Sequence, residues 1–361
     1  MVARGRSDTS VQLGRRWSPI PQTAEVLGKR GGHSSTVVGK NIYVIGGRVE
    51  TQDGGSEQFF NDTLRLDLQH NRWERLCLDA PFAPRAYHSA TLVGEEIWLI
   101  GGSDLSHIYP DVHVLDLVTL TWREVTRSIK GDPLAATGRT GHRAIRHPSD
   151  SNTILIYGGF TSQESTGGAY VGLLTALDTK RKVMSDLRPR GVSPTPRGYH
   201  AFVAVGSSRC LIIGGRTSQE DGNWQLVEGS DFVVLYNSET NTWEHPTCTG
   251  AAMPARANFG ATCIASASQT PPAHPLLALD GSSSNGEGLL VTHGGAKGAK
   301  NGGQRLSDMW LLHVSWRKGG GPAASTEVRW IEGSTAEPME TAGDSAMFPG
   351  RAAHTLSHAN R

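Results

Sequence analysis

The sequence predicts an all-β fold assembled from a repeated unit of four short strands. Two regularities lead to this prediction: the pattern Arg-x-x-His recurs along the chain, and an apolar run that ends in Gly-Gly follows most copies. Successive copies lie roughly 55 residues apart, a spacing at which each repeat forms one supersecondary unit. A unit this small cannot bury both faces of its sheet, so neighbouring units must cover it.

The stretch from 84 to 122 shows the unit most clearly. Arg85 and His88 open it, Gly101-Gly102 closes its apolar second run, and Trp122 ends it. Turn residues separate its runs, which is typical of short strands joined by tight connections. A late Trp closes most of the other copies as well, at Trp73, Trp243 and Trp330.

A residue that recurs at one position in each unit is expected to perform the same structural task every time. We therefore interpret the repeated residues as scaffold. Adjacent glycines let backbones approach closely, Trp buries area between units, and Arg and His satisfy carbonyl groups between strands. The repeated positions are Arg30, His33, Gly46, Gly47, Arg85, His88, Gly101, Gly102, Arg139, His142, Gly158, Gly159, Arg197, His200, Gly214, Gly215, Gly294 and Gly295.

These residues resemble the kelch repeat across about residues 13–358, nearly the whole chain. The resemblance implies a kelch-type β-propeller in which each repeat forms one four-stranded blade. We expect blades at about residues 30–75, 85–124, 139–188, 197–245 and 256–332. A sixth, incomplete blade is expected to close the ring from residues 13–20 and 350–358, behind a disordered N-terminal tail at residues 1–12.

Two units depart from the pattern. The third has no closing Trp, and Met184 or Leu187 is expected to fill that space. The fifth has Phe259 in place of the repeated His and contains inserted loops rich in Pro, Ser and Gly, such as 270–288. These insertions are either a contact surface or loop length tolerated at little cost, and both readings stay open.

Composition and charge exclude several classes of protein. The formal net charge of +1 does not favour a nucleic-acid partner. No window of eighteen apolar residues predicts a membrane span. The four widely spaced cysteines favour neither a zinc site nor a disulfide framework, and the N-terminus lacks the apolar region of a secretory signal. We expect a monomer in the cytoplasm or the nucleus.

The positions that vary between units are the candidates for recognition. By resemblance to kelch propellers that bind peptides, two slots should face the mouth of the ring: the residue two after the repeated Arg, and the residue directly after Gly-Gly. Tyr and Arg in these slots supply rigid contact area and bidentate donors, which favours binding, although a solvated rim would look similar. The predicted binding residues are Arg48, Tyr87, Ser103, Phe160, Tyr199, Arg216 and Asn258.

The function expected from these features is a non-catalytic adaptor that binds a protein or peptide, and two arginines in the slots favour an acidic or carboxylate-bearing peptide. No Gly-x-Ser-x-Gly elbow or phosphate-binding loop is present, and no catalytic residue, metal ligand or cofactor is predicted. The alternative is a small-molecule enzyme, an isomerase or a metal-dependent oxidoreductase, that uses the central channel.

Overall fold

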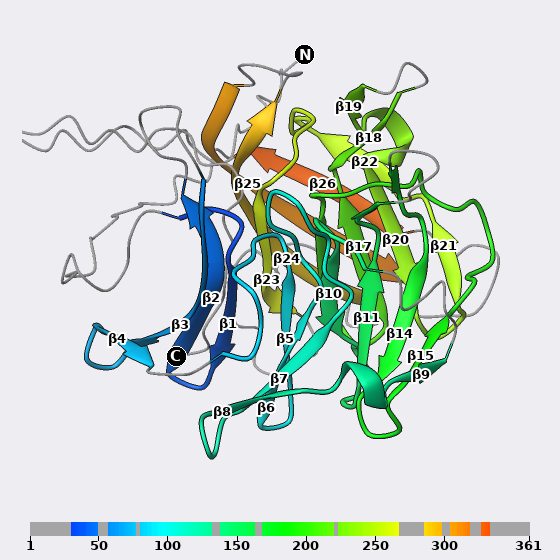
Figure 1. The fold of residues 1–361 in the computed structure, drawn as a ribbon. Helices are drawn as coiled ribbons and strands as arrows, with labels where there is room; N and C mark the ends of the chain where they lie inside the picture. Colours follow the sequence, from blue (N-terminus) through cyan, green and yellow to red (C-terminus); the bar gives the residue numbers. More distant parts are fainter. Residues whose placement is uncertain are drawn as a thin grey trace, which may run out of the picture.

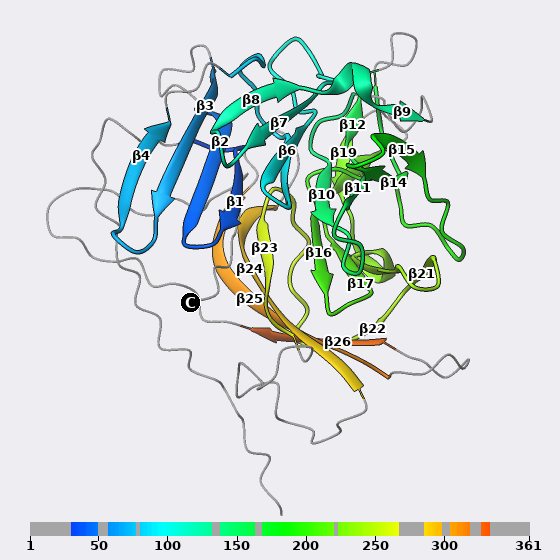
Figure 2. The same ribbon diagram turned by 90° about the horizontal axis from the view of Figure 1, so that it is seen from below.

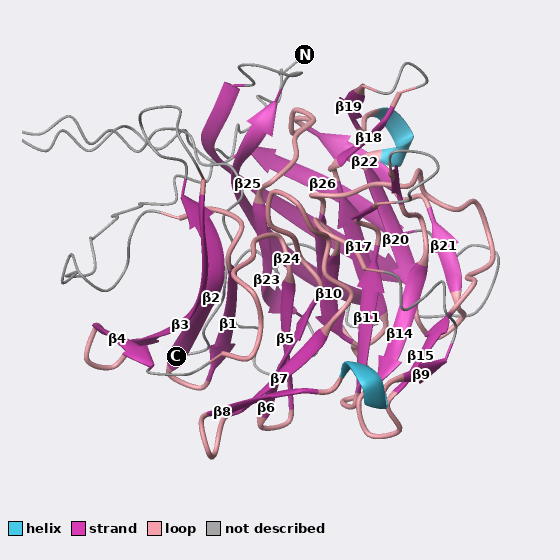
Figure 3. Cartoon of the chain, viewed as in Figure 1, coloured by secondary structure: helices cyan, strands magenta, loops and turns pink. Residues whose placement is uncertain are grey.

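The computed structural model describes residues 30–49, 57–76, 80–131, 138–162, 168–219, 223–266, 285–297, 304–317 and 326–332. Within these ranges the chain forms β-strands and two 3-10 helices, η1 (Thr126–Ser128) and η2 (Gly229–Asp231), and no α-helix (Figure 3). In this part of the chain no helix is long and apolar enough to cross a membrane.

The strands form five four-stranded antiparallel blades, in the order that the repeats predict. Blade one contains β1 (Ser34–Val38), β2 (Asn41–Val49), β3 (Gln58–Asp67) and β4 (Arg72–Leu76). Blade two contains β5 (Ser89–Val93), β6 (Glu96–Ile100), β7 (Val112–Asp116) and β8 (Thr121–Glu124). Blade three contains β10 (Arg143–Arg146), β11 (Thr153–Tyr157), β14 (Leu174–Asp178) and β15 (Val183–Asp186).

Blades four and five complete the described part of the ring. Blade four contains β16 (Ala201–Val205), β17 (Arg209–Ile213), β20 (Val233–Asn237) and β21 (Thr242–Glu244), and blade five contains β23 (Gly260–Ser266), β24 (Asn285–Lys297), β25 (Gln304–Arg317) and β26 (Thr326–Glu332). Two small hairpins lie beyond the Gly-Gly pairs of blades three and four: β12 (Phe160–Thr161) with β13 (Ala169–Tyr170), and β18 (Arg216–Ser218) with β19 (Trp224–Leu226).

The blades follow one another around a common axis (Figures 1 and 2). Their first strands are the inner ones, because β1 contacts β5, β5 contacts β10, β10 contacts β16 and β16 contacts β23. This arrangement confirms the predicted kelch-type β-propeller for five blades. The expected closing blade, at residues 13–20 and 350–358, lies outside the described residues, as does the expected tail.

The segments that lead into blades three, four and five add an edge strand that the sequence analysis did not predict. β9 (Lys130–Gly131) pairs in parallel with β15, and β22 (Thr247–Gly250) pairs in parallel with β26. Arg190 makes a single parallel bridge to Thr242 of β21. Each incoming segment thus covers the outermost strand of the blade it enters, where backbone groups would otherwise be unpaired.

The hydrophobic core lies between the faces of neighbouring blades. Trp243 packs against Tyr157 of blade three, with ring centroids 5.6 Å apart, and Trp330 packs against Phe232 of blade four at 5.9 Å. Of the two expected substitutes for the missing Trp of blade three, Met184 takes its place, because it is buried against the preceding blade two. Leu187 instead packs on the opposite side, facing blade four. The predicted role of Trp between blades is therefore confirmed at these positions.

Candidate binding surface around the ring axis

The repeated arginines are clamps within their own blades. Arg85 is fully buried, and its guanidinium donates to the carbonyl of Gly101 at 3.1 Å and to the carboxylate of Asp111. Three other arginines donate in the same way to a glycine carbonyl and to an aspartate carboxylate. The pairs are Arg30 with Asp62, Arg197 with Asp231, and Arg256 with Asp308. The carbonyl contact is of the kind expected for Arg, whereas the aspartate was not predicted.

Two of the repeated histidines, His88 and His142, bond to serine side chains of the preceding blade, a partner that was not predicted. The Nε2 atom of His88 hydrogen-bonds to Oγ of Ser34 at 2.9 Å, and Nε2 of His142 bonds to Oγ of Ser89 at the same distance. Burial, together with nearby arginines, lowers the pKa of His88 to about 3, so this imidazole is neutral at pH 7. Within the described ranges no cluster of His, Cys, Asp or Glu could hold a metal ion.

The Gly-Gly pairs join each blade to the next. The N–H of Gly47 donates to the carbonyl of Arg85 at 2.8 Å, and the same bond links Gly102 to Arg139, Gly159 to Arg197 and Gly215 to Arg256. A Cβ on Gly46 would lie 2.9 Å from the carbonyl oxygen of Arg85. Only glycine permits this close approach between blades, which favours a structural role for the pair.

The residues of the first variable slot form a continuous series of contacts around the axis through the five described blades. We call its described members, Gly32, Tyr87, Gly141, Tyr199 and Asn258, the collar. Each collar residue after Gly32 donates its N–H to the carbonyl of the collar residue in the preceding blade, at 2.7–3.0 Å. All five have φ between +57° and +67°, the left-handed conformation. This conformation is natural for Gly and tolerated by Asn, but it is strained for Tyr.

Gly141 brings the two strained tyrosines together. Because blade three has no side chain in its collar position, the rings of Tyr87 and Tyr199 meet across it edge to face, with centroids 5.1 Å apart. A Cβ on Gly141 would lie 2.8 Å from Cζ of Tyr199. Tyr199 is buried, whereas Tyr87 remains partly exposed.

An arginine from the second slot lies at each end of the tyrosine pair. Nε of Arg48 donates to the Tyr87 hydroxyl at 3.1 Å, and the Arg216 guanidinium lies 4.0 Å from the centroid of the Tyr199 ring. We call Arg48, Tyr87, Tyr199 and Arg216 the axial row. It joins blades one, two and four in one continuous polar and aromatic surface.

The two arginines of the axial row differ in their electrostatic surroundings. Arg48 forms an ion pair with Glu57, so much of its charge is balanced. Arg216 lies between the rings of Tyr199 and Trp224 and has no ion pair with a carboxylate of the described residues. Burial opposes the charge of Arg216, but the hydroxyls of Tyr199 and Tyr170 outweigh burial and raise its pKa above the ordinary value.

The remaining predicted residues of the two slots lie elsewhere around the axis. Oγ of Ser103 hydrogen-bonds to Oγ1 of Thr140 at 2.9 Å, and the Phe160 ring packs edge to face on Tyr170 at 5.3 Å. The side-chain oxygen of Asn258 is buried and has no hydrogen-bond partner among the described residues. The structure therefore joins four of the seven predicted residues directly in the axial row. Asn258 meets it through its backbone bond to Tyr199, and Phe160 through Tyr170, which lies beside Arg216.

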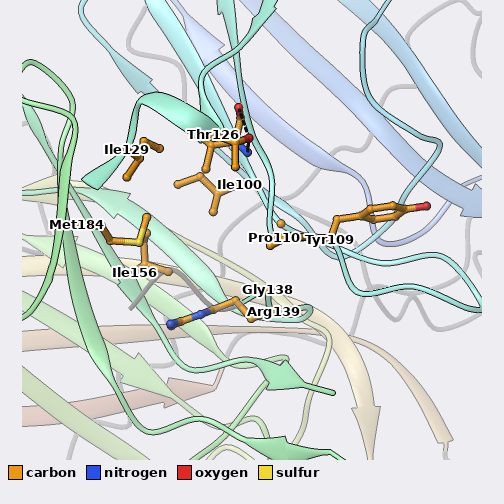
Figure 4. A pocket seen from close by; sticks show the side chains of 11 residues that line it. Ile100, Tyr109, Pro110, Thr126, Ile129, Gly138, Arg139, Ile156 and Met184 are labelled. Carbon is orange, nitrogen blue, oxygen red and sulfur yellow. Dashed lines mark hydrogen bonds between the residues drawn. The ribbon is translucent and has the colours of Figure 1, made fainter. Parts of the chain in front are cut away.

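A small cavity between blades two and three lies apart from the axial row (Figure 4). It has a volume of about 100 Å³, and its walls include Ile100, Ile156, Met184 and the side chain of Arg139. Blade three has no aspartate corresponding to Asp111. Burial lowers the pKa of Arg139 to about 10, an effect that Asp186 opposes. This cavity belongs to the apolar seam between blades.

Comparisons with known proteins agree with this architecture. The sequence model of the Attractin/LZTR1 beta-propeller matches residues 10–270. The chain is 27% identical to Kelch domain-containing protein 3 of Bos taurus, over 61% of this chain and 57% of the relative. It is 28% identical to Acyl-CoA-binding domain-containing protein 5 of Arabidopsis thaliana, over 82% and 39%, and 25% identical to Host cell factor of Drosophila melanogaster, over 58% and 15%. The match to the kelch relative covers just over half of its length.

Proposed function

The chain belongs to the kelch-repeat β-propeller family, and we propose that it binds a segment of another protein at the mouth of its ring, over the axial row. Its kelch and β-propeller relatives indicate a protein-interaction module. The location of the binding site and the chemistry of the partner are our own proposals, beyond what the relatives indicate. We propose an acidic or carboxylate-bearing segment as the partner.

The observation that carries the proposal is the backbone strain of Tyr87 and Tyr199. A left-handed residue with a side chain costs about 1–2 kcal/mol relative to the right-handed form, and glycine or asparagine avoids this cost in the other collar positions. Strained residues cluster at ligand sites because the surrounding structure maintains them for a function. Two tyrosines in contact, flanked by arginines, have the composition of a binding hot spot.

The charge of Arg216 supports an acidic partner. A guanidinium without a carboxylate of its own can donate two parallel hydrogen bonds to an incoming carboxylate, and the low local dielectric strengthens them. Arg48 has a different role in this proposal, because Glu57 already balances it. It orients the Tyr87 hydroxyl.

Affinity capture followed by mass spectrometry tests the proposal. Wild-type protein should enrich a partner that the variant Arg216→Ala binds at least about tenfold more weakly, because a charge-assisted hydrogen bond contributes about 1.5–3 kcal/mol. The matched control is Arg146→Ala, which removes an exposed arginine at the end of β10. Equal enrichment by wild type and Arg216→Ala, with both folded by circular dichroism, contradicts the proposed site.

A further inference from the structure

A second site lies on the ring axis, in the central channel between the inner strands. It is a cavity of about 130 Å³, and all five described blades contribute to its wall. At roughly 30 Å³ for each water molecule, this volume holds about four waters, enough for a small ion but not for a nucleotide or a peptide. The polar side chains of its wall come from Ser34, Ser35, His88, Ser89 and Arg143.

Arg143 interrupts the regular pairing of histidine with serine inside this channel. The residue after the repeated His is Ser34 in blade one and Ser89 in blade two, and each serine accepts or donates a bond with the next blade's histidine. In blade three the same position is Arg143, so His200 of blade four faces a cation instead of a hydroxyl. Both ring nitrogens of His200 are buried and have no hydrogen-bond partner among the described residues.

Among the described residues of the channel, no carboxylate balances the positive charge of Arg143. None of the described residues of β1, β5, β10, β16 and β23 is acidic, and no described aspartate or glutamate pairs with Arg143. Burial lowers the pKa of Arg143, while the neighbouring Tyr199 and Tyr87 oppose that change. A partly buried charge without a counter-charge is costly, and a bound anion would offset that cost.

We propose that the central channel binds one small oxyanion, of the carboxylate or phosphate class, with the Arg143 guanidinium in its wall as the main ligand. The planar guanidinium matches the oxygen geometry of both classes. Burial, together with the charge of the neighbouring Arg143, lowers the pKa of His200 well below its ordinary value, so its imidazole does not add a second positive charge beside Arg143 at pH 7. This site does not rest on the proposed protein partner, because a free ion would occupy it.

Isothermal titration calorimetry with sodium acetate and with sodium phosphate, each at ionic strength matched by NaCl, tests this site on the full chain. Wild-type protein should bind one of the two anions with one-to-one stoichiometry, and the same anion should raise Tm in a saturable way. The anion that saturates at lower concentration identifies the ligand class.

Two variants and one control decide the outcome. Arg143→Ser restores the serine of blades one and two and should remove all binding heat and the Tm response, and Arg143→Gln should do the same while keeping most of the side-chain volume. Arg146→Ser, on the same strand but exposed, should behave as wild type. The proposal is overturned if wild-type protein binds neither anion, or if either Arg143 variant keeps the wild-type response.

Discussion

At the scale of single residues, the collar combines one backbone conformation with several side chains. The left-handed φ is required because it points each N–H along the ring towards the preceding blade. Glycine meets this requirement without strain, so a tyrosine in the same position costs stability that the fold alone does not require. In the collar, therefore, the backbone conformation serves the fold, and the side chains are available to contact a partner.

Replacing Gly141 with alanine should disturb the tyrosine pair as well as the backbone. The variant adds left-handed strain of about 1 kcal/mol and a contact of Cβ with the Tyr199 ring, which should bring the total loss of unfolding free energy to about 2–4 kcal/mol. Urea unfolding measures this loss. If the proposed function is correct, partner binding should weaken too.

Gly39→Ala is the matched control for this prediction. Gly39 has φ +56°, but nothing lies within 4 Å of a Cβ at that position, so only the backbone term should appear. A loss for Gly141→Ala no larger than that for Gly39→Ala would contradict the packing of Tyr199 over the collar.

At the scale of a blade, a buried arginine and an aspartate hold the inner strands to the third strand. Burial alone would raise the pKa of Asp111, but hydrogen bonds from Arg85 and His113 outweigh burial and hold the pKa well below its usual range. Burial is likewise outweighed at Asp308 by a hydrogen bond from Arg256, and at Asp231 by a hydrogen bond from Thr195 together with the charge of Arg197, so the pKa of each carboxyl is lowered. These carboxylates are therefore ionised in the folded protein at any physiological pH.

Asp111→Asn should lower the free energy of unfolding by about 2–3 kcal/mol at pH 7. This loss is at or below the low end of what breaking a buried ion pair costs, because Asp111 keeps some contact with water. Urea unfolding checks the value. Asp116→Asn, in an exposed turn of the same blade, keeps an oxygen that can accept from Val118 and Thr119 and should lose nothing measurable. A loss in Asp116→Asn equal to that in Asp111→Asn would contradict the clamp.

The same substitution should change the response to acid. Because the folded pKa of Asp111 lies below its unfolded value of about 3.9, its contribution is complete above that pH and is lost as the pH falls towards the folded pKa. The free energy of unfolding of wild type should therefore fall below about pH 4, and Asp111→Asn should show a shallower fall. Parallel pH curves for the two proteins would show that Asp111 is not the titrating group.

The sequence predicted the glycines but not the aspartates, and spacing explains the difference. Gly-Gly always ends an apolar run, so it is visible in each copy. The aspartate partners lie 26, 32, 34 and 52 residues after their arginines, because the intervening loops differ in length. A clamp without a fixed spacing leaves no periodic signal in one sequence. The short edge strands β9 and β22 were missed because neither has an apolar alternating pattern.

At the scale of the whole molecule, similar contacts recur at each interface between neighbouring described blades. The Gly-to-Arg bonds and the collar bonds repeat from blade to blade, and the Trp contacts close the outer seams. The order of the five described blades follows from the repeat and was predicted. The meeting of Tyr87 with Tyr199 was not predicted, because it depends on the missing side chain of Gly141 in the blade between them.

The central claim for the whole molecule is that the repeated residues build the ring, whereas the variable residues of the axial row bind the partner. Hydrogen-exchange mass spectrometry of the protein with and without its captured partner tests it most directly. Slower exchange in peptides that contain Tyr87, Tyr199 and Arg216, with unchanged exchange in the outer strands β4, β8 and β21, is the predicted result. Protection confined to those outer strands, with the axial row unchanged, would contradict it.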